Sequence, residues 1–197
     1  AGFAVRRFPT PYALSFEALG INRIWPGNPV NRRYRCLDLD FDLESDVEQP
    51  AGAFLMIRRD AWGALGGFDE GFEPLWFEDV DFLKRLAASG YRVRYVPAAA
   101  ARHAGGHSVS RMPSQLRQAC WYASLLRYVF KHFQPAGRVA TWAAVVAGYT
   151  MRTLYGVFSQ WNLEPLRVYG RVIRFACLRL LSGRNGEAGR SPARARQ

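Results

Sequence analysis

The sequence has few of the features that mark secreted or disulfide-stabilised proteins. It contains only three cysteines in 197 residues, and they are far apart and odd in number: Cys36, Cys120 and Cys177. This spacing excludes a disulfide framework and a cysteine-based metal site, and it fits buried thiols in a reducing compartment. The first residues, AGFAVRRFPTPYAL, include no initiator methionine and no signal peptide, so we expect the chain to begin inside a longer one.

Acidic residues are also scarce, and the excess positive charge lies in one part of the chain. The sequence has 27 Lys and Arg against 16 Asp and Glu, a formal net charge of +11 at pH 7. Residues 131–197 hold 11 of the basic residues and only two of the acidic ones. This asymmetry predicts an anionic partner for the C-terminal third, either a membrane surface or a nucleic acid.

No long, uninterrupted hydrophobic run is present. The most apolar stretch, VATWAAVVAGYTMRTLYGVF at residues 139–158, contains Arg152 and two glycines. A membrane-spanning helix needs about 20 predominantly apolar residues. We therefore expect a helix that packs on the protein or lies on a membrane surface, rather than one that spans the bilayer.

The hydrophobic pattern in the middle of the chain predicts an α/β unit. Residues 52–59, GAFLMIRR, form a continuous apolar run of the length of a buried strand. Residues 78–90 have a helical pattern that ends at Gly90, and residues 91–97 alternate as in a strand. A strand, a helix and a strand in this order are typical of α/β proteins.

Shorter elements are predicted around this unit. A short helix over residues 15–19 is ended by Gly20, residues 25–33 form a loop, and residues 38–46 form an acidic loop or an edge strand. Asp60 is placed to cap one helical turn that a Gly-Gly pair ends.

After Pro113 the pattern becomes helical. Three helices with broad apolar faces are predicted, followed by a disordered tail: residues 114–133, 137–160, 164–182 and 183–197. In the third helix, Arg167, Arg171 and Arg174 form one basic stripe. The stripe fits either an anionic lipid surface or solvated arginines on helices that pack together.

Six of the 16 acidic residues are concentrated within residues 68–86, FDEGFEPLWFEDVDFLKRL. One interpretation is structural: Glu78 and Asp79 stabilise a helix N-terminus, Asp81 pairs with Arg85, and Asp69 and Glu70 shape the preceding turn. The other interpretation is a site, because the adjacent Trp-Phe pair offers an apolar wall. A carboxylate beside such a wall can have its pKa raised and act as a base.

Five ordered segments resemble the C-terminal half of family 2 glycosyltransferases. They are GAFLMIRRDAW, GGFDEGF, WFEDVDFLKRLAASGYRVRYVP, a loop histidine, and GGHS. The most similar group is that of the bacterial rhamnosyl- and galactofuranosyl-transferases. The resemblance covers about residues 1–130 and is strongest over residues 50–110.

The resemblance implies an α/β fold in which residues 1–113 form the C-terminal, acceptor-side half of a GT-A (Rossmann-like) nucleotide-diphospho-sugar transferase domain. Residues 114–182 would then be an amphipathic, membrane-associating extension. The implied reaction is an inverting transfer of a sugar from a nucleotide-sugar, for example a dTDP-rhamnose-like donor. The implied acceptor is a glycan or a polyprenyl-diphosphate-linked sugar in cell-surface polysaccharide synthesis, at the cytoplasmic face of the bacterial plasma membrane.

The resemblance also implies roles for individual residues. Asp79 corresponds to the general base that takes the proton of the acceptor hydroxyl, and Glu78 would orient the acceptor. His103 corresponds to a histidine that binds the divalent metal, Mn²⁺ or Mg²⁺, which offsets charge on the diphosphate leaving group. His107 is a competing ligand, whereas His132, inside a helix, is expected to be structural.

Four further residues are candidates for substrate binding, and three of them have a structural alternative. Trp76 stacks on a sugar or belongs to the core, and Gly52 allows close approach of a ligand or only tight packing. Ser108, with the backbone amides of GGHS, would meet a phosphate. Arg111 contacts the diphosphate or is a solvated loop residue.

One motif is set aside, and two other function classes remain open. DLDFD at residues 38–42 contains two D-x-D triplets, but the family's metal-binding D-x-D precedes the GAFLMIRR segment by roughly a hundred residues, so we do not expect a metal there.

The nucleotide-binding half would be missing, and the chain alone is expected to be inactive. The alternatives are a catalytically inactive scaffold with this fold and, because of the basic composition, a nucleic-acid-binding protein; the chain contains no recognised nucleic-acid-binding motif, so no nucleic acid is expected as a partner.

Overall fold

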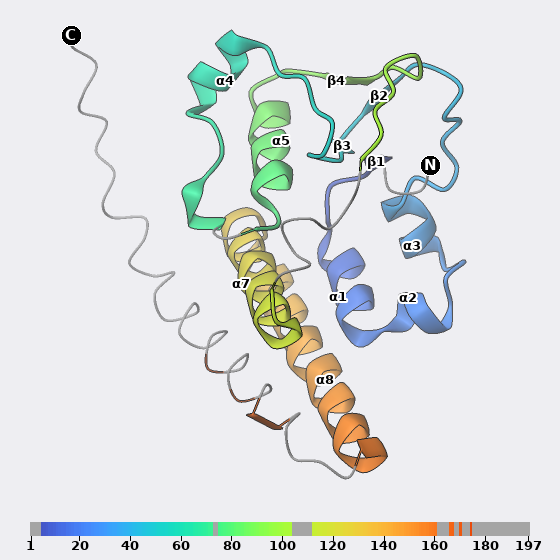
Figure 1. The fold of residues 1–197 in the computed structure, drawn as a ribbon, viewed down its shortest axis with the longest axis vertical. Coiled ribbons are helices and arrows are strands. Elements are labelled where there is room, and N and C mark those ends of the chain that lie inside the picture. The colour runs from blue at the N-terminus through green and yellow to red at the C-terminus, as the bar shows by residue number, and fades with distance from the viewer. Residues whose placement is uncertain are drawn as a thin grey trace, which may run out of the picture.

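The computed structural model describes residues 5–72, 75–103 and 112–160, together with residues 166, 167, 170 and 174 (Figure 1). The chain has a mixed α/β structure in which helices predominate. Its strands are β1 (Val5–Arg6), β2 (Ser45–Val47), β3 (Gln49–Pro50) and β4 (Val93–Tyr95). Its helices are α1 (Pro11–Leu19), α2 (Ile21–Ile24), α3 (Pro29–Tyr34), α4 (Arg59–Leu65), the 3₁₀ turn η1 (Glu70–Phe72), α5 (Glu78–Ala88), α7 (Ser114–His132) and α8 (Pro135–Gln160).

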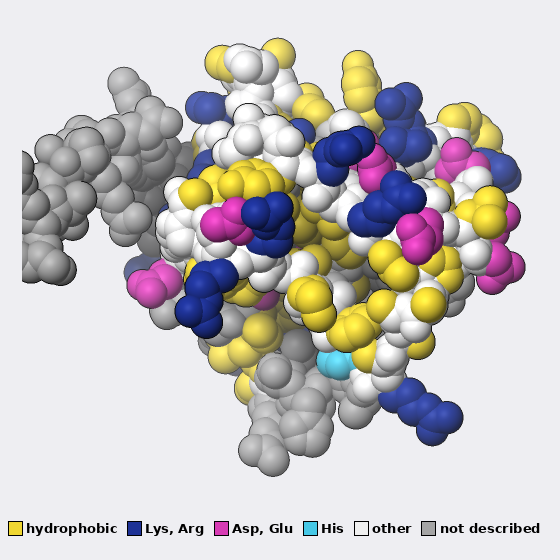
Figure 2. Space-filling view, turned by 90° about the horizontal axis from the view of Figure 1, so that it is seen from above, with side chains coloured by type: hydrophobic (Ala, Val, Ile, Leu, Met, Phe, Trp, Pro, Cys, Tyr) yellow, Lys and Arg dark blue, Asp and Glu magenta, His cyan; other side chains and the backbone are white. Residues whose placement is uncertain are grey.

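The strands form two small antiparallel sheets, β1 with β3 and β2 with β4. In the second sheet Asp46 lies opposite Arg94, whose guanidinium also contacts Glu44 at 3.2 Å. The strand predicted over residues 91–97 is therefore present as β4, and the end of the acidic segment 38–46 forms its partner. This end of the molecule carries basic and acidic side chains beside one another among hydrophobic ones (Figure 2).

The buried strand predicted over residues 52–59 is wrong. In the described part of the chain this segment pairs with no strand; it turns at residues 52–54 and then runs without regular secondary structure into α4. Leu55 and Ile57 pack against the side chains of α5, whereas Phe54 is exposed and Met56 is 97% exposed. Only one face of the segment is covered, so the continuous apolar run gives a half-buried segment.

Helix boundaries in the N-terminal part differ from the prediction because of capping. The loop predicted over residues 25–33 is wrong at its end, since α3 begins at Pro29 and the Asn28 side chain accepts the Asn31 N–H at 2.8 Å. Helix α1 is longer than predicted and ends, as predicted, at Gly20, with φ 76°. Asp60 does not cap α4; the cap position is Arg58, without a side-chain hydrogen bond.

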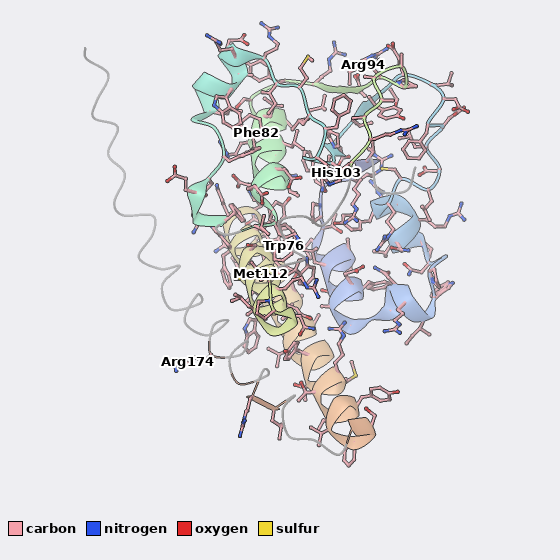
Figure 3. The ribbon with its side chains drawn as sticks, viewed as in Figure 1. Trp76, Phe82, Arg94, His103, Met112 and Arg174 are labelled. Carbon is pink, nitrogen blue, oxygen red and sulfur yellow. The ribbon has the colours of Figure 1, made fainter. Side chains whose placement is uncertain are left out.

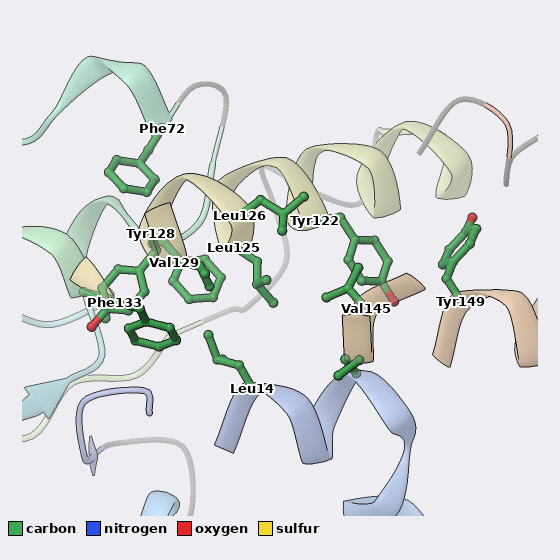
Figure 4. Packing of buried hydrophobic residues seen from close by; sticks show 14 residues of the cluster. Leu14, Phe72, Tyr122, Leu125, Leu126, Tyr128, Val129, Phe133, Val145 and Tyr149 are labelled. Atoms are coloured by element: carbon green, nitrogen blue, oxygen red, sulfur yellow. The ribbon is translucent and has the colours of Figure 1, made fainter. Parts of the chain in front are cut away.

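Helix α7 lies at the centre of the main core. Its buried residues Leu125, Leu126 and Val129 pack against α1 and α8 on one side and against Phe72 and Phe77 on the other (Figure 4). Because α7 contacts α1 and α8 as well as Phe72 and Phe77, it joins the N-terminal part of the chain to the helical extension.

The apolar stretch 139–158 is part of α8, which packs along α1. A Cβ atom at Gly148 would collide with the Ala18 carbonyl, so the two helices approach each other very closely there. The Arg152 guanidinium donates to the Ala18 carbonyl at 2.6 Å and to the Tyr122 hydroxyl at 2.8 Å, which accounts for a charge inside an apolar stretch. Within the described ranges, none of the helices combines the length and the hydrophobicity needed to cross a bilayer.

Most of the predicted third helix, residues 164–182, lies outside the described residues, as does the tail 183–197. Arg167 and Arg174 are described and exposed, and Arg171 is not among the described residues.

Candidate functional site

The site predicted from the acidic cluster lies at the N-terminus of α5, after two aromatic residues with unusual backbone geometry. Trp76 has φ 73° and Phe77 has φ 69°, both in the left-handed region that bulky residues rarely adopt. Each such residue costs on the order of 1–3 kcal/mol and is retained only where the surroundings enforce it. The enforcing contacts come from α7: the Phe77 ring packs on Tyr128, and the Ser124 hydroxyl donates to the Leu75 carbonyl at 2.8 Å.

Asp79 and Gly52 are brought together although 27 positions separate them. The Gly52 N–H donates to Asp79 Oδ2 at 3.0 Å, and the Val80 N–H donates to Oδ1 at 2.8 Å. The predicted close approach at Gly52 exists, but the group that approaches the glycine here is the Asp79 side chain. Backbone donors therefore contact both oxygens of this carboxylate and fix its orientation.

Glu78, the neighbour of Asp79, is half-buried and incompletely satisfied. Its Oε2 atom is buried and has no hydrogen-bond partner among the residues that the structure describes. Burial raises the pKa of Glu78, and the adjacent Asp79 charge raises it further, against the opposing effect of the Glu78 backbone N–H. Unsatisfied buried polar atoms of this kind are rare in folded proteins.

Asp81 is fully buried and is bound by three side chains, those of Arg85, Lys131 and His132. Arg85 Nε donates to Oδ2 at 2.9 Å, which confirms the predicted pair, and Lys131 Nζ lies 2.7 Å from Oδ1. His132 Nε2 also lies 2.7 Å from Oδ1, so its expected structural role is confirmed. Burial opposes ionisation of Asp81, but the hydrogen bonds from His132, Lys131 and Arg85 outweigh it and lower the pKa.

Asp69 is held by the same end of α7. Its carboxylate accepts the Gly71 N–H at 2.9 Å, as expected for a turn residue, and it also contacts Arg127 at 2.9 Å and Lys131 at 2.8 Å. Burial acts to raise the pKa of Asp69, but the Lys131 and Gly71 hydrogen bonds and the nearby charges bring it well below its usual range. Sequence reasoning missed these α7 partners because about 60 positions separate them from Asp69.

The remaining predicted site residues are only partly described. Trp76 is half-buried against the main core, and His103 is exposed; Figure 3 shows where the two lie relative to α5 and α7. His107, Ser108 and Arg111 lie outside the described residues. Among residues 5–72, 75–103 and 112–160, no group of three or more His, Cys, Asp or Glu side chains could hold a metal ion.

The DLDFD segment forms a local turn. The Asp42 N–H donates to Asp40 Oδ1 at 2.9 Å, so this D-x-D triplet satisfies its own backbone.

Comparisons with known proteins identify a family and two kinds of relative. The family model described as glycosyl transferase family group 2 matches residues 39–181. The N-acetylglucosaminyl-diphospho-decaprenol L-rhamnosyltransferase of Mycobacterium tuberculosis (strain H37Rv) is 40% identical over 90 residues, which are 46% of this chain and 29% of that protein. The rhamnosyltransferase WbbL of Escherichia coli (strain K12) is 33% identical over 107 residues, 53% of this chain and 36% of that protein.

The matched region thus spans about a third of the length of these curated relatives. No solved structure matches the chain.

Proposed function

The chain belongs to glycosyl transferase family group 2, and we propose that the protein transfers a sugar, with inversion, from a nucleotide-sugar to a glycan or polyprenyl-diphosphate-linked acceptor. The names of the relatives support a rhamnose-type donor, and one of them names a diphospho-decaprenol-linked acceptor. The reaction would serve cell-surface polysaccharide synthesis.

The observation that carries the proposal is the pair of carboxylates at the start of α5. In the proposed reaction, Asp79 takes the proton of the acceptor hydroxyl while its oxygen attacks the anomeric carbon. The new C–O bond forms as the bond to the nucleoside diphosphate breaks on the opposite face, which inverts the anomeric configuration. Glu78, half-buried beside Asp79, would orient the acceptor.

Members of the family generally use a divalent metal, and we propose His103 as one ligand of Mn²⁺ or Mg²⁺. The exposed imidazole of His103 is accessible to an ion, but a single histidine supplies only one ligand, and the described residues offer no complete set. When bound, the metal would offset the charge that develops on the diphosphate leaving group.

We further propose that residues 1–113 are the acceptor-side half of a GT-A domain and that residues 114–182 are its extension. The order of the family-like segments supports this division, and the family match runs across both parts, over residues 39–181. Binding of a nucleotide-sugar to this chain, with and without Mn²⁺, tests it by calorimetry. Weak binding is expected, because the half of the GT-A domain that binds the nucleotide would not be part of residues 1–113. Tight, metal-dependent binding would contradict the division.

An anionic membrane surface is the proposed site of action, and the end of α8 supports it. Four exposed apolar residues follow helical spacing there: Met151, Leu154, Tyr155 and Phe158. Tyr155 and Phe158 are each 76% exposed, and Figure 1 shows this end of α8 extending beyond α1 and α7. Helix α8 contains no acidic residue, and the exposed Arg167 and Arg174 that follow it complement anionic lipid.

Sedimentation with vesicles tests the membrane proposal independently of catalysis. The double variant Leu154→Glu/Phe158→Glu should lose at least about tenfold in affinity for vesicles of anionic phospholipid, because two charges enter the apolar face. The matched control is Val139→Glu, since Val139 is 67% exposed at the other end of α8. Equal vesicle binding by the double variant and the control would contradict the proposal. A double variant that binds vesicles like the wild type but changes its oligomeric state would also contradict it.

Transfer of a labelled sugar to a lipid-linked acceptor tests the proposed reaction in the longer protein of which we expect this chain to be a part, because the chain alone is expected to be inactive. The wild-type protein should form a product of inverted anomeric configuration, which NMR of the glycoside detects. The Asp79→Asn variant should form almost none. Equal transfer by the variant would exclude Asp79 as the base, and no transfer by either protein would favour the inactive-scaffold alternative.

A further inference from the structure

The segment that precedes α4 contributes one more residue to the site. We propose that Gly52 is a positioning residue for Asp79: its N–H and its lack of a side chain hold the Asp79 carboxylate in one orientation. The inference rests on the proposed role of Asp79 as the base, and it assigns Gly52 a contact with the protein's own carboxylate in place of a contact with substrate.

The space at Gly52 is filled by Asp79. A Cβ atom at position 52 would lie 2.7 Å from Asp79 Oδ2, 3.0 Å from its Cβ and 3.2 Å from its Cγ. Real Cβ atoms essentially never approach another heavy atom that closely, and Asp79 is a short side chain fixed at a helix start. The φ of Gly52 is not in the left-handed region, so its backbone conformation does not call for glycine. The contact with Asp79 is the feature that favours glycine at position 52.

The segment that carries Gly52 is held on both sides, so its N–H has a fixed position relative to α5. Before it, β3 pairs with β1 through Gln49 and Pro50. After it, Leu55 and Ile57 pack in the cluster formed around Phe82 of α5, the helix that carries Asp79. The Gly52 N–H is unpaired with any described strand, and this leaves it available to the carboxylate.

The two backbone donors leave part of the carboxylate open. An ionised carboxylate has about four lone-pair positions, and the Gly52 and Val80 N–H groups occupy one on each oxygen. The remaining positions can accept the proton of an incoming hydroxyl. Because a displacement of about 1 Å in a reacting group can cost about 100-fold in rate, the orientation of Asp79 is expected to matter for turnover.

The kinetic test compares two identical substitutions at different glycines, introduced into the longer protein of which we expect this chain to be a part. Gly52→Ala displaces the Asp79 carboxylate, so kcat for sugar transfer should fall about 10- to 100-fold with KM within about twofold. Gly63→Ala in α4 is the matched control, because a Cβ there meets nothing within 4 Å. In an Asp79→Asn background Gly52→Ala should have little further effect on kcat. An unchanged kcat in Gly52→Ala would overturn the proposal. So would an equally large loss of kcat when Gly52→Ala is introduced into the Asp79→Asn variant.

Amide hydrogen exchange tests the same contact without any activity. In the wild-type chain the Gly52 amide should be protected, and Asp79→Ala should remove that protection while the amide of Leu83 in α5 stays protected. If the wild-type chain and Asp79→Ala both fold and the Gly52 amide is equally protected in the two, the proposal is overturned. A wild-type protein without transferase activity would count against the proposed function alone, since the exchange measurement decides the Gly52 contact separately.

Discussion

Two pairs of carboxylates within residues 69–81 differ sharply in their surroundings. Asp69 and Asp81 are bound by cationic side chains of α7 and share Lys131, at 2.8 and 2.7 Å. Glu78 and Asp79, between them in the sequence, form no ion pair in the described part of the chain; Asp79 is contacted by backbone N–H groups instead. The acidic cluster therefore contains an anchor, formed by Asp69 and Asp81, and a candidate site, formed by Glu78 and Asp79.

Helical geometry separates the two functions. Residues two positions apart in an α-helix point about 200° away from each other, so Asp79 faces Gly52 while Asp81 faces α7. Asp81 fixes α5 from one side, and the Asp79 carboxylate lies on the other. The strained Trp76–Phe77 pair immediately precedes α5, and α7 contacts hold it in place.

The largest expected effect is on the site. Asp79→Asn should lower kcat about 1,000-fold, because a general base contributes roughly 10²- to 10⁴-fold, while the free energy of unfolding changes little. Glu78→Gln should lower kcat less, since it removes an orienting group and not the proton acceptor. Initial rates of sugar transfer by the longer protein of which we expect this chain to be a part measure both variants. A Glu78→Gln variant that is the more impaired of the two would reverse the assigned roles.

The next effect is on the anchor. Asp81→Asn leaves Lys131 and His132 without their buried partner, so the free energy of unfolding should fall by about 3 kcal/mol. Urea denaturation measures the change. The matched control is Asp46→Asn, which removes an exposed partner of Arg94 and should change stability by less than about 0.5 kcal/mol. Equal losses in the two variants would show that Asp81 is no anchor.

A smaller effect is expected in the dependence of stability on pH. The lowered pKa values of Asp69 and Asp81 in the folded state stabilise the protein above the unfolded value of about 3.9, and this stabilisation is lost as the pH falls through the folded values. Glu78 has the opposite sign: its pKa is raised, so its contribution is complete below the unfolded value of about 4.3 and is lost as the pH rises.

Urea midpoints between pH 3 and pH 8 separate the two contributions. Asp81→Asn should flatten the loss of stability on acidification, whereas Glu78→Gln should stabilise the protein at neutral pH by an amount that vanishes near pH 4. Identical pH profiles for the two variants would contradict the assigned environments.

The elements that follow local rules could be predicted from the sequence. The α5 pattern, the Asp81–Arg85 pair and the glycine that ends α1 depend on residues within a few positions, and the structure confirms them. The segment 52–59 could not be predicted, because an apolar run does not show whether one face or two will be covered. The resemblance singled out Asp79, and the apolar run that Gly52 begins singled out Gly52. Their contact depends on tertiary packing, as does the contact of Lys131 with Asp69 and Asp81.

The separation of anchor and site is tested most directly by the turnover of folded Asp81→Asn protein, measured beside Asp79→Asn well below either unfolding temperature. We expect the anchor variant to retain at least about a tenth of the wild-type kcat and the site variant to fall below about a hundredth. An Asp79→Asn enzyme that turns over as fast as the Asp81→Asn enzyme would contradict the account.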